Sequence, residues 1–263
     1  MNGETMHPFY FGREKRRLFG VFHRPEGTAR GAVLMCPPLL HEQFRSYRFF
    51  SRIAAELAAA GLGCLRFDYF GTGDSEGEDS DFSPAECGED IAIAAEELRR
   101  RCDGVPLILM GIRGSALLGA REARRVGACA LWLWQPVTDA GRYLQTLEQR
   151  DLQERGSRYR FPLRDQIAPA AASDLMGFQL SGRFRAEWTA LDASACDSDI
   201  PVAIVDSACK DWPSPSRCSY YELPAESTAW SDEVDLSGLI PVRGVRPALA
   251  ALISDLPRWT AHG

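Results

Sequence analysis

The segment around Arg113 has the spacing of a reactive turn, but the residue type at its centre does not fit that chemistry. Leu107 to Ile112 reads as a buried strand, and small residues follow it as the start of a helix. A tight strand-to-helix turn with the pattern G-x-S-x-G presents a nucleophile at its tip for attack on a carbonyl carbon. Here Gly111 fills the first glycine position and Ser115 fills the last, so Arg113 takes the tip. An arginine stays protonated and cannot act as a nucleophile.

The two partners of such a nucleophile would be an acid after a late strand and a histidine near the C-terminus. Asp211 lies where the acid loop is expected, with Asp206 as a second candidate. After the last predicted strand the chain reads PAESTAW, without a histidine. Three histidines precede the turn and one lies a single residue from the end: His7, His23, His41 and His262. Two of the three catalytic roles are therefore unfilled, which typically costs many orders of magnitude in rate.

A displaced nucleophile is the alternative. Ser115 lies two residues past the tip, and we expect its hydroxyl to face the helix or to cap its N-terminus. His41 follows the loop Pro37 to Leu40, which corresponds to the loop that donates a backbone amide to the oxyanion in enzymes with this turn. A cleft-lining or surface role fits His41 best, and a base supplied from this loop stays open.

An arginine at the tip suggests an anion site. It would project a guanidinium into the cleft from a helix N-terminus, where amide groups and the helix dipole favour a carboxylate or phosphate. The alternative is that Glu42, Asp68 or Asp211 neutralises Arg113 and the pair only holds the cleft together. The candidate ligand-binding residues follow from the tip and its neighbouring loops: Arg113, Gly114, Leu39, Leu40, Glu42 and Asp68.

The elements that must position these residues alternate along the chain. Strands are predicted at 9–23 (a pair), 31–36, 63–67, 107–112, 128–134, 200–206 and 219–223, and helices at 47–60, 84–101 and 247–256. Strands that alternate with helices at this spacing predict an α/β fold with a mainly parallel, doubly wound sheet. We expect one domain over 1–263. The polar, helical segment 141–192 has no clear strand and is predicted to be a helical cap, with peripheral helices as the alternative.

A glycine-rich loop follows the second parallel strand. Asp68 to Ser75 reads DYFGTGDS, and its glycines permit backbone angles that other residues avoid, while its acidic and hydroxyl groups bond the turn locally. The G-x-G-x-x-G spacing of a dinucleotide-binding loop is absent. The loop therefore indicates the fold and says little about a reaction.

Composition excludes several classes of function. The net charge of −6 and pI near 5.4 disfavour nucleic-acid binding. The first 16 residues hold no long apolar stretch, so we expect no signal peptide or membrane span and a cytoplasmic location. The eight cysteines form no C-x-x-C pair and suit a reducing compartment. We expect neither a metal nor a cofactor.

With these motifs assembled, the chain resembles the α/β-hydrolase superfamily, and within it the second type of exosortase-associated hydrolase. The resemblance lies in Pro37-Pro38 with Glu42, Ser46 and Arg48, in RFDYFGTGDS, in GIRGSA and in LWLWQPV. Relatives of this type also read G-[LI]-R-x-G-A at the turn, whereas Gly114-Ser115 reverses the size order here. The resemblance implies a bacterial setting of surface-protein export and exopolysaccharide, and it implies no activity.

The sequence therefore supports three hypotheses. The first is a hydrolase homologue without hydrolase activity that binds an anionic small molecule, an acyl carrier or a protein partner around Arg113. The second is an esterase or thioesterase that uses Ser115 and His41. The third is a structural partner protein, and the sequence does not determine an oligomeric state.

Overall fold

The computed structural model describes residues 6–156, 174–195, 199–207, 212, 218–225 and 242–260. Its main sheet has eight strands in the order β1-β2-β4-β3-β5-β6-β9-β10. The strands are β1 (Met6–Arg13), β2 (Arg16–His23), β3 (Gly31–Cys36), β4 (Leu62–Phe67), β5 (Leu107–Ile112), β6 (Ala130–Trp134), β9 (Val202–Asp206) and β10 (Cys218–Glu222). From β4 to β10 every neighbouring pair is parallel, whereas β2 pairs antiparallel with both of its neighbours, β1 and β4. The predicted mainly parallel sheet is confirmed.

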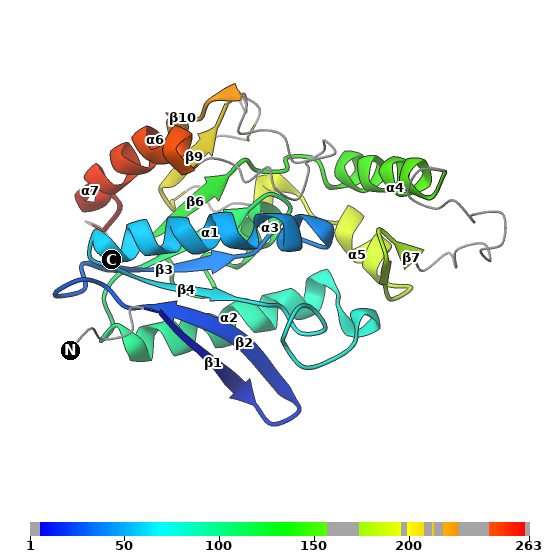
Figure 1. Ribbon diagram of the computed structural model, residues 1–263, viewed down its shortest axis with the longest axis horizontal. Helices are drawn as coiled ribbons and strands as arrows, with labels where there is room; N and C mark the ends of the chain where they lie inside the picture. The colour runs from blue at the N-terminus through cyan, green and yellow to red at the C-terminus, as the bar shows by residue number, and fades with distance from the viewer. Residues whose placement is uncertain are drawn as a thin grey trace.

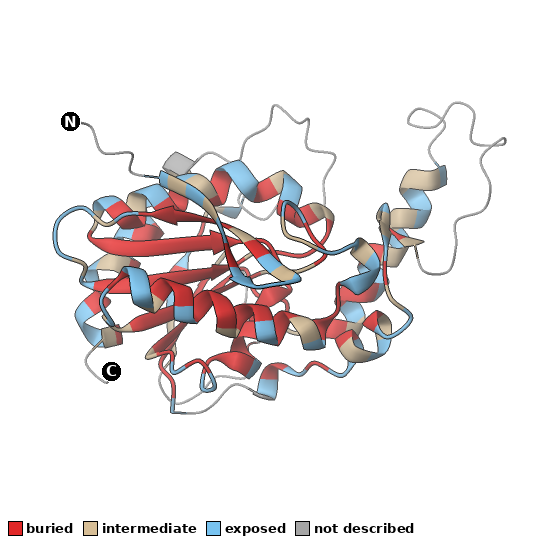
Figure 2. Cartoon of the chain, turned by 90° about the horizontal axis from the view of Figure 1, so that it is seen from below, coloured by how far each residue is buried: buried red, intermediate tan, exposed pale blue. Residues whose placement is uncertain are grey.

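Helices cover both faces of this sheet (Figure 1). One face packs α2 (Pro84–Arg101) and α3 (Ser115–Glu122), and the other packs α1 (His41–Ala59), α6 (Val242–Ser254) and α7 (Leu256–Thr260). The five central strands β3, β4, β5, β6 and β9 are buried along nearly their whole length, as Figure 2 shows. Strands covered on both faces read as continuous apolar runs, which is why the sequence located them well.

Helix α1 begins earlier than predicted, at His41 instead of Tyr47. Its first two turns bury Glu42, Gln43 and Ser46, so polar residues occupy the inward face there. An apolar periodicity cannot reveal a helix whose buried positions are polar. The part that the sequence missed is the part that lies beside Arg113.

The predicted cap segment, 141–192, holds two described helices and a short hairpin. Helix α4 (Ala140–Gly156) and helix α5 (Phe184–Thr189) flank the antiparallel strands β7 (Asp174–Leu175) and β8 (Phe178–Gln179). The hairpin was not predicted, because two-residue strands carry no usable alternation. In Figure 1 these elements lie together on one side, beyond the carboxyl ends of the parallel strands.

The glycine-rich loop after β4 is held by its own polar groups. The Asp68 carboxylate accepts from the Asp74 amide at 3.1 Å, and the Ser75 hydroxyl donates to the Asp68 carbonyl at 2.6 Å. Gly73 has a positive φ of 56°, and a Cβ there would lie 2.4 Å from the Asp68 carboxylate, so no other residue fits. The loop therefore performs the local folding role that the sequence predicts for it.

Candidate functional site

Arg113 lies at the tip of an intact strand-to-helix turn between β5 and α3. Its φ is 54°, an angle that side-chain-bearing residues rarely adopt. The Arg113 amide donates to the Trp134 carbonyl at 3.0 Å, and the Arg113 carbonyl accepts from Val137 at 3.2 Å and from Ala116 at 3.0 Å. A Cβ at Gly111 would lie 2.7 Å from the Ala116 Cα, so the close approach of strand and helix requires glycine there. The turn thus keeps its strained geometry without a nucleophile.

The guanidinium of Arg113 forms an ion pair with Glu42 from the first turn of α1. Its Nη2 and Nε lie 3.2 Å and 3.3 Å from the same carboxylate oxygen, Oε1, and its Nη1 donates to the Gln135 carbonyl at 3.1 Å. The other carboxylate oxygen, Oε2, accepts from the Tyr143 hydroxyl of α4 at 2.9 Å. Of the three acidic partners considered from the sequence, the structure brings Glu42 to Arg113.

This ion pair is unequally exposed. The Glu42 side chain is 4% exposed and the Arg113 side chain is 20% exposed, so the cation contributes more of the cleft surface than the carboxylate. Burial and the neighbouring Glu42 carboxylate raise the pKa of Tyr143 well above its ordinary value, which keeps that hydroxyl a donor. Glu42 is therefore satisfied by one cation and one neutral donor.

A cleft with a volume of about 420 Å³ opens in front of Arg113. Its walls come from the first turn of α1, the loop after β6 and one face of α4. The described lining residues are His41, Glu42, Arg113, Pro136, Val137, Thr138, Asp139, Arg142, Tyr143, Thr146, Leu147, Gln149, Arg150 and Gln153. The volume lies in the range of small-molecule sites, which is roughly 300–1,000 Å³.

The cleft is electropositive around His41. Burial and the nearby cations Arg150, Arg45 and Arg113 together lower the pKa of His41 to about 4 against the opposing effect of Glu154, so its imidazole is neutral at pH 7. Its Nδ1 is buried and has no hydrogen-bond partner among the described residues. The three arginines together outweigh the one carboxylate that opposes them, Glu154, and this favours an anion beside the imidazole.

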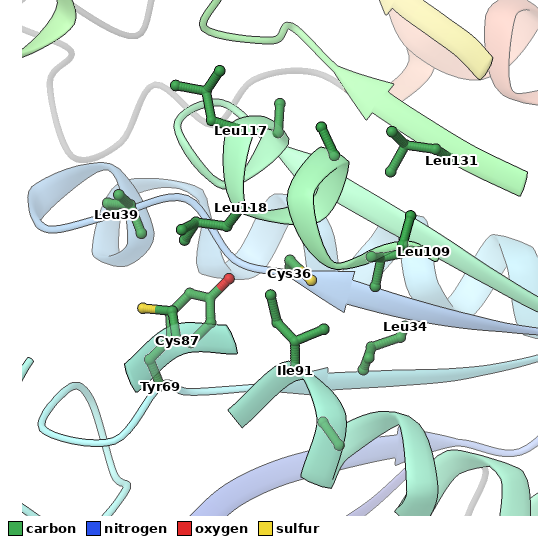
Figure 3. Close-up of a cluster of buried hydrophobic side chains, with 14 of the residues drawn as sticks. Leu34, Cys36, Leu39, Tyr69, Cys87, Ile91, Leu109, Leu117, Leu118 and Leu131 are labelled. Atoms are coloured by element: carbon green, nitrogen blue, oxygen red, sulfur yellow. The ribbon is translucent and has the colours of Figure 1, made fainter. Parts of the chain in front are cut away.

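Ser115 points away from this cleft. It is fully buried; its hydroxyl donates to the Pro37 carbonyl at 2.5 Å and lies 3.1 Å from the Tyr69 hydroxyl. Figure 3 shows Tyr69 among the packed side chains of Leu39, Leu118 and Cys87. The only proton of the Ser115 hydroxyl is thus committed to a carbonyl, and the described lining of the cleft that contains His41 does not include Ser115.

Several other predicted site residues lie beneath the cleft surface. Leu39 and Leu40 are each 2% exposed. A Cβ at Gly114 would lie 2.9 Å from the Trp188 ring and 3.4 Å from the Tyr143 ring, so side chains of the cap segment cover this glycine. Asp68 accepts from the Gln43 amide at 2.6 Å and lines a separate, much smaller cavity.

The candidate acid and base of a triad are not brought together within the described residues. Asp206 ends β9, where its carboxylate accepts from the Ser207 amide at 2.6 Å. Asp211 and His262 lie outside the described residues. His7 and His23 belong to the antiparallel strands β1 and β2, and His23 accepts from Arg66 at 3.3 Å.

Sequence reasoning missed the contributions of Tyr143, Arg142 and Arg150 to the site. All three lie on α4, which the sequence treats only as part of a polar, helical segment. The available signal was the recurrence of polar residues at helical spacing from Arg142 to Gln153. That pattern normally marks a solvated face, so it does not indicate a cleft by itself.

Comparisons with known proteins support the fold. No family model matches the chain, and no curated protein matches it. Est1E from Butyrivibrio proteoclasticus superposes with a TM-score of 0.64 at 14% identity, covering 97% of this chain and 99% of that one. A thermostable carboxyl esterase from Bacillus coagulans gives a TM-score of 0.59 at 10% identity, covering 98% and 100%. An α/β serine hydrolase without lid from Xanthomonas campestris gives 0.52 at 13% identity, covering 99% and 96%.

These similarities confirm the predicted α/β-hydrolase fold. At such low identities they concern the fold alone and leave the reaction to the residues of the site. Among the described helices, none is long and apolar enough to cross a membrane, and the described residues contain no cluster of potential metal ligands.

Proposed function

We propose that this protein is an α/β-hydrolase homologue without hydrolase activity that binds an anionic small molecule in the cleft before Arg113. The observation that carries the proposal is the Arg113–Glu42 pair at the tip of the turn. A guanidinium occupies the position of the attacking atom and is fixed there by a buried carboxylate. The turn that would hold a nucleophile instead holds one wall of a positively charged cleft.

The anion would be attracted by the cations that line the cleft. Arg113 balances Glu42, and Arg150 lies 2.9 Å from Glu154. The Arg142 side chain forms no ion pair within the described part of the chain, although it lines the same cleft. Because arginine binds carboxylates and phosphates through paired N–H groups, Arg142 is the side chain with most capacity for a ligand.

Thermal unfolding tests this proposal with inorganic phosphate and sulfate as probes. Both anions should raise the melting temperature of the wild type, because a ligand that binds only the folded state stabilises it by mass action. The increase should shrink with added sodium chloride and largely vanish in Arg142→Met. The matched control is Arg52→Met on α1, an exposed arginine that does not line the cleft. Equal stabilisation of all three proteins would show general exclusion of the anions from protein surfaces and overturn the proposal.

The rival function is an esterase or thioesterase that uses Ser115 with His41. No specific contact favours it, since the Ser115 hydroxyl donates to Pro37 and His41 lines a different space. A fluorophosphonate probe, which labels only activated serines, should leave the protein unlabelled. Labelling that is lost in Ser115→Ala would instead establish the rival.

We also propose a cellular setting from the resemblance in GIRGSA and its companion motifs: a cytoplasmic protein in an exosortase-linked system for export and exopolysaccharide. In this setting the cleft would bind an anionic intermediate, and the alternative ligands are an acyl carrier or a protein partner. The measurement is the exopolysaccharide output of a bacterium in which Arg142→Met replaces the wild-type protein. Unchanged output alongside lost anion binding would contradict the link.

A further inference from the structure

Helix α4 presents a polar stripe along one wall of the open cleft, where most of its side chains also contact solvent. Its buried face is formed by Tyr143, Leu144 and Leu147. The other residues of α4 that line the cleft form a polar stripe along one side of the helix: Arg142, Thr146, Gln149, Arg150 and Gln153. From the first to the last, this stripe extends about 16 Å at the helical rise per residue. The ligand surface is therefore long and hydrogen-bonding along its whole length.

The side chains of the stripe are mixed in charge and in hydrogen-bonding type. Two guanidiniums only donate, whereas the amides of Gln149 and Gln153 both donate and accept. The Thr146 hydroxyl donates to the Arg142 carbonyl at 2.9 Å and retains its capacity to accept. Hydroxyl groups are the partners that match amides and hydroxyls, because they too donate and accept.

An acyl chain does not suit this surface. It would remove the amides and guanidiniums from water without offering hydrogen bonds, and each unpaired polar group costs free energy. The apolar residues of the lining, Pro136, Val137 and Leu147, lie outside the stripe. The stripe thus favours a ligand that donates and accepts hydrogen bonds along its length and carries acidic groups beside the two arginines.

We infer that the cleft binds a polyhydroxylated carboxylic acid, of the class of acidic sugars and short acidic oligosaccharides. Its carboxylates would pair with Arg142 and Arg150, and its hydroxyls would bond Thr146, Gln149 and Gln153. This inference rests on the proposed function and deepens it by naming the ligand class. A phosphate or simple carboxylate would use only the arginines, so the glutamines distinguish the classes.

Calorimetric titration with three probes tests the class. Digalacturonate carries both carboxylates and hydroxyls, suberate carries two carboxylates without hydroxyls, and maltose carries hydroxyls without charge. We expect digalacturonate to bind the wild type about tenfold more tightly than either other probe, the equivalent of about 1.4 kcal/mol. Binding of suberate or maltose as tight as that of digalacturonate would overturn the inferred class.

Two glutamines of α4 provide a matched pair of variants. Gln145 and Gln149 are both exposed, and only Gln149 lines the cleft. Gln149→Ala should weaken digalacturonate several-fold and leave suberate unchanged, while Gln145→Ala should change neither. Equal affinities of the two variants for digalacturonate would contradict the role of the stripe.

Arg142→Met separates this inference from the proposed function. It should weaken digalacturonate and suberate alike, because both probes need the cation. If it does so while Gln149→Ala has no effect, the cleft is an anion site and the sugar-acid class is wrong. If Arg142→Met leaves the affinity of both acids unchanged, the proposed function itself fails.

Discussion

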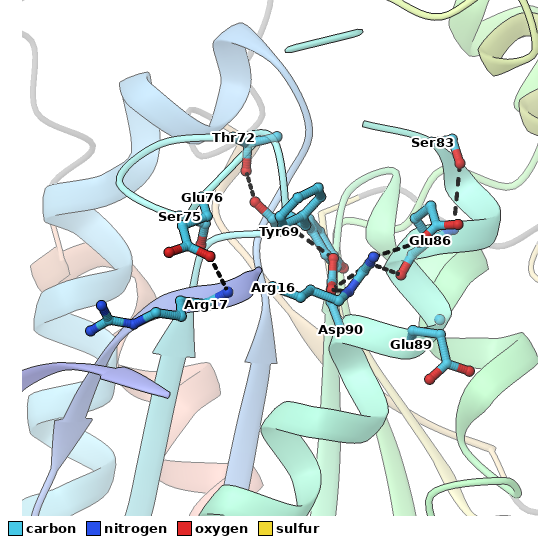
Figure 4. Close-up of polar contacts among 12 residues, drawn as sticks. Arg16, Arg17, Tyr69, Thr72, Ser75, Glu76, Ser83, Glu86, Glu89 and Asp90 are labelled. Atoms are coloured by element: carbon cyan, nitrogen blue, oxygen red, sulfur yellow. Dashed lines mark hydrogen bonds and ion pairs between the residues drawn. The ribbon is translucent and has the colours of Figure 1, made fainter. Parts of the chain in front are cut away.

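Two arginine–carboxylate ion pairs of this fold differ in their surroundings: one joins structural elements, and the other also lines a cleft. Arg16 of β2 contacts Asp90 of α2 at 2.7 Å and Glu86 at 2.5 Å, and Asp90 also accepts from the Phe70 amide at 2.9 Å (Figure 4). This network fastens the β1–β2 hairpin and the glycine-rich loop to α2. Arg113 instead meets a single oxygen of Glu42 and faces a cleft.

The two arginines differ in how completely protein groups surround them. In the Arg16 network two carboxylates surround the guanidinium, and its Nη2 also donates to the Glu86 carbonyl at 3.1 Å. At the turn, the second carboxylate oxygen of Glu42 accepts a hydrogen bond from the Tyr143 hydroxyl, and Arg113 lines the open cleft. A buried pair with an open side is placed where a ligand could contact it, as the proposed anion site requires.

The largest expected effect comes from breaking the Arg16–Asp90 ion pair. Arg16→Met leaves the Asp90 carboxylate, which is 1% exposed, without its cation. We expect the free energy of unfolding at pH 8 to fall by about 3 kcal/mol, as for other broken buried pairs. Burial already raises the pKa of Asp90 to about 6, so protonation below that pH should relieve part of the loss. Urea unfolding at pH 8 and pH 5 measures both, and an equal loss at the two pH values would contradict this account.

Breaking the Arg113–Glu42 pair should cost less. We expect Arg113→Met to lower the free energy of unfolding by about 2 kcal/mol, because Tyr143 continues to donate to the stranded Glu42. The double variant Arg113→Met/Glu42→Gln should recover most of this loss, since it removes the unpaired charge. Urea unfolding of the wild type, the two single variants and the double variant completes a double-mutant cycle, which gives the coupling energy between the two side chains. Strict additivity would show that the two side chains are not coupled.

Acid should weaken the fold through the histidines. Burial lowers the pKa of His23 and of His41 to about 4, so each binds a proton more readily when unfolded. Their contribution is present above pH 6.5 and is lost as the pH falls toward 4. Asp90 acts oppositely, because its raised pKa favours the folded state as the pH falls below 6. Burial raises the pKa of Asp68 as well, but less than that of Asp90. Because the two histidines have the larger shifts, we expect a net loss of stability between pH 6.5 and 4.

His41→Asn isolates the contribution of the cleft to this pH dependence. The variant should unfold with a shallower pH dependence than the wild type between pH 6.5 and 4, as measured by melting temperature at a series of pH values. His7→Asn is the control, on the half-exposed position of β1. An identical slope in wild type and His41→Asn would remove His41 from the explanation.

The smallest expected effect is on catalysis. Arg113→Ser restores a hydroxyl at the tip of the turn, but the described histidine that lines the same cleft, His41, has a pKa lowered to about 4 and no described carboxylate bonded to its buried Nδ1. Turnover of p-nitrophenyl acetate should therefore stay at the background rate in both wild type and variant. Rapid turnover by Arg113→Ser would reveal a base outside the described part of the chain.

The sequence by itself determined the central strands of the sheet and the position of Arg113 at the tip of the turn. The central strands are apolar runs buried on both faces, so composition and spacing suffice to place β3, β5 and β6. The turn pattern places Arg113 at the tip because the glycine and small-residue positions reflect close backbone contacts that are local in sequence. The arginine at the tip, and the lack of a histidine directly after the last predicted strand, are also readable from the sequence alone.

Only the tertiary structure decided which groups Arg113 meets. Glu42 lies 71 positions away and Tyr143 lies 30 positions beyond Arg113, and no sequence pattern links them. The first turns of α1 were missed because their buried positions are polar, and the α4 stripe resembles a solvated helix face. In both cases local periodicity reports only how polar a face is, whereas the fold decides whether that face meets water, a partner side chain or a cleft.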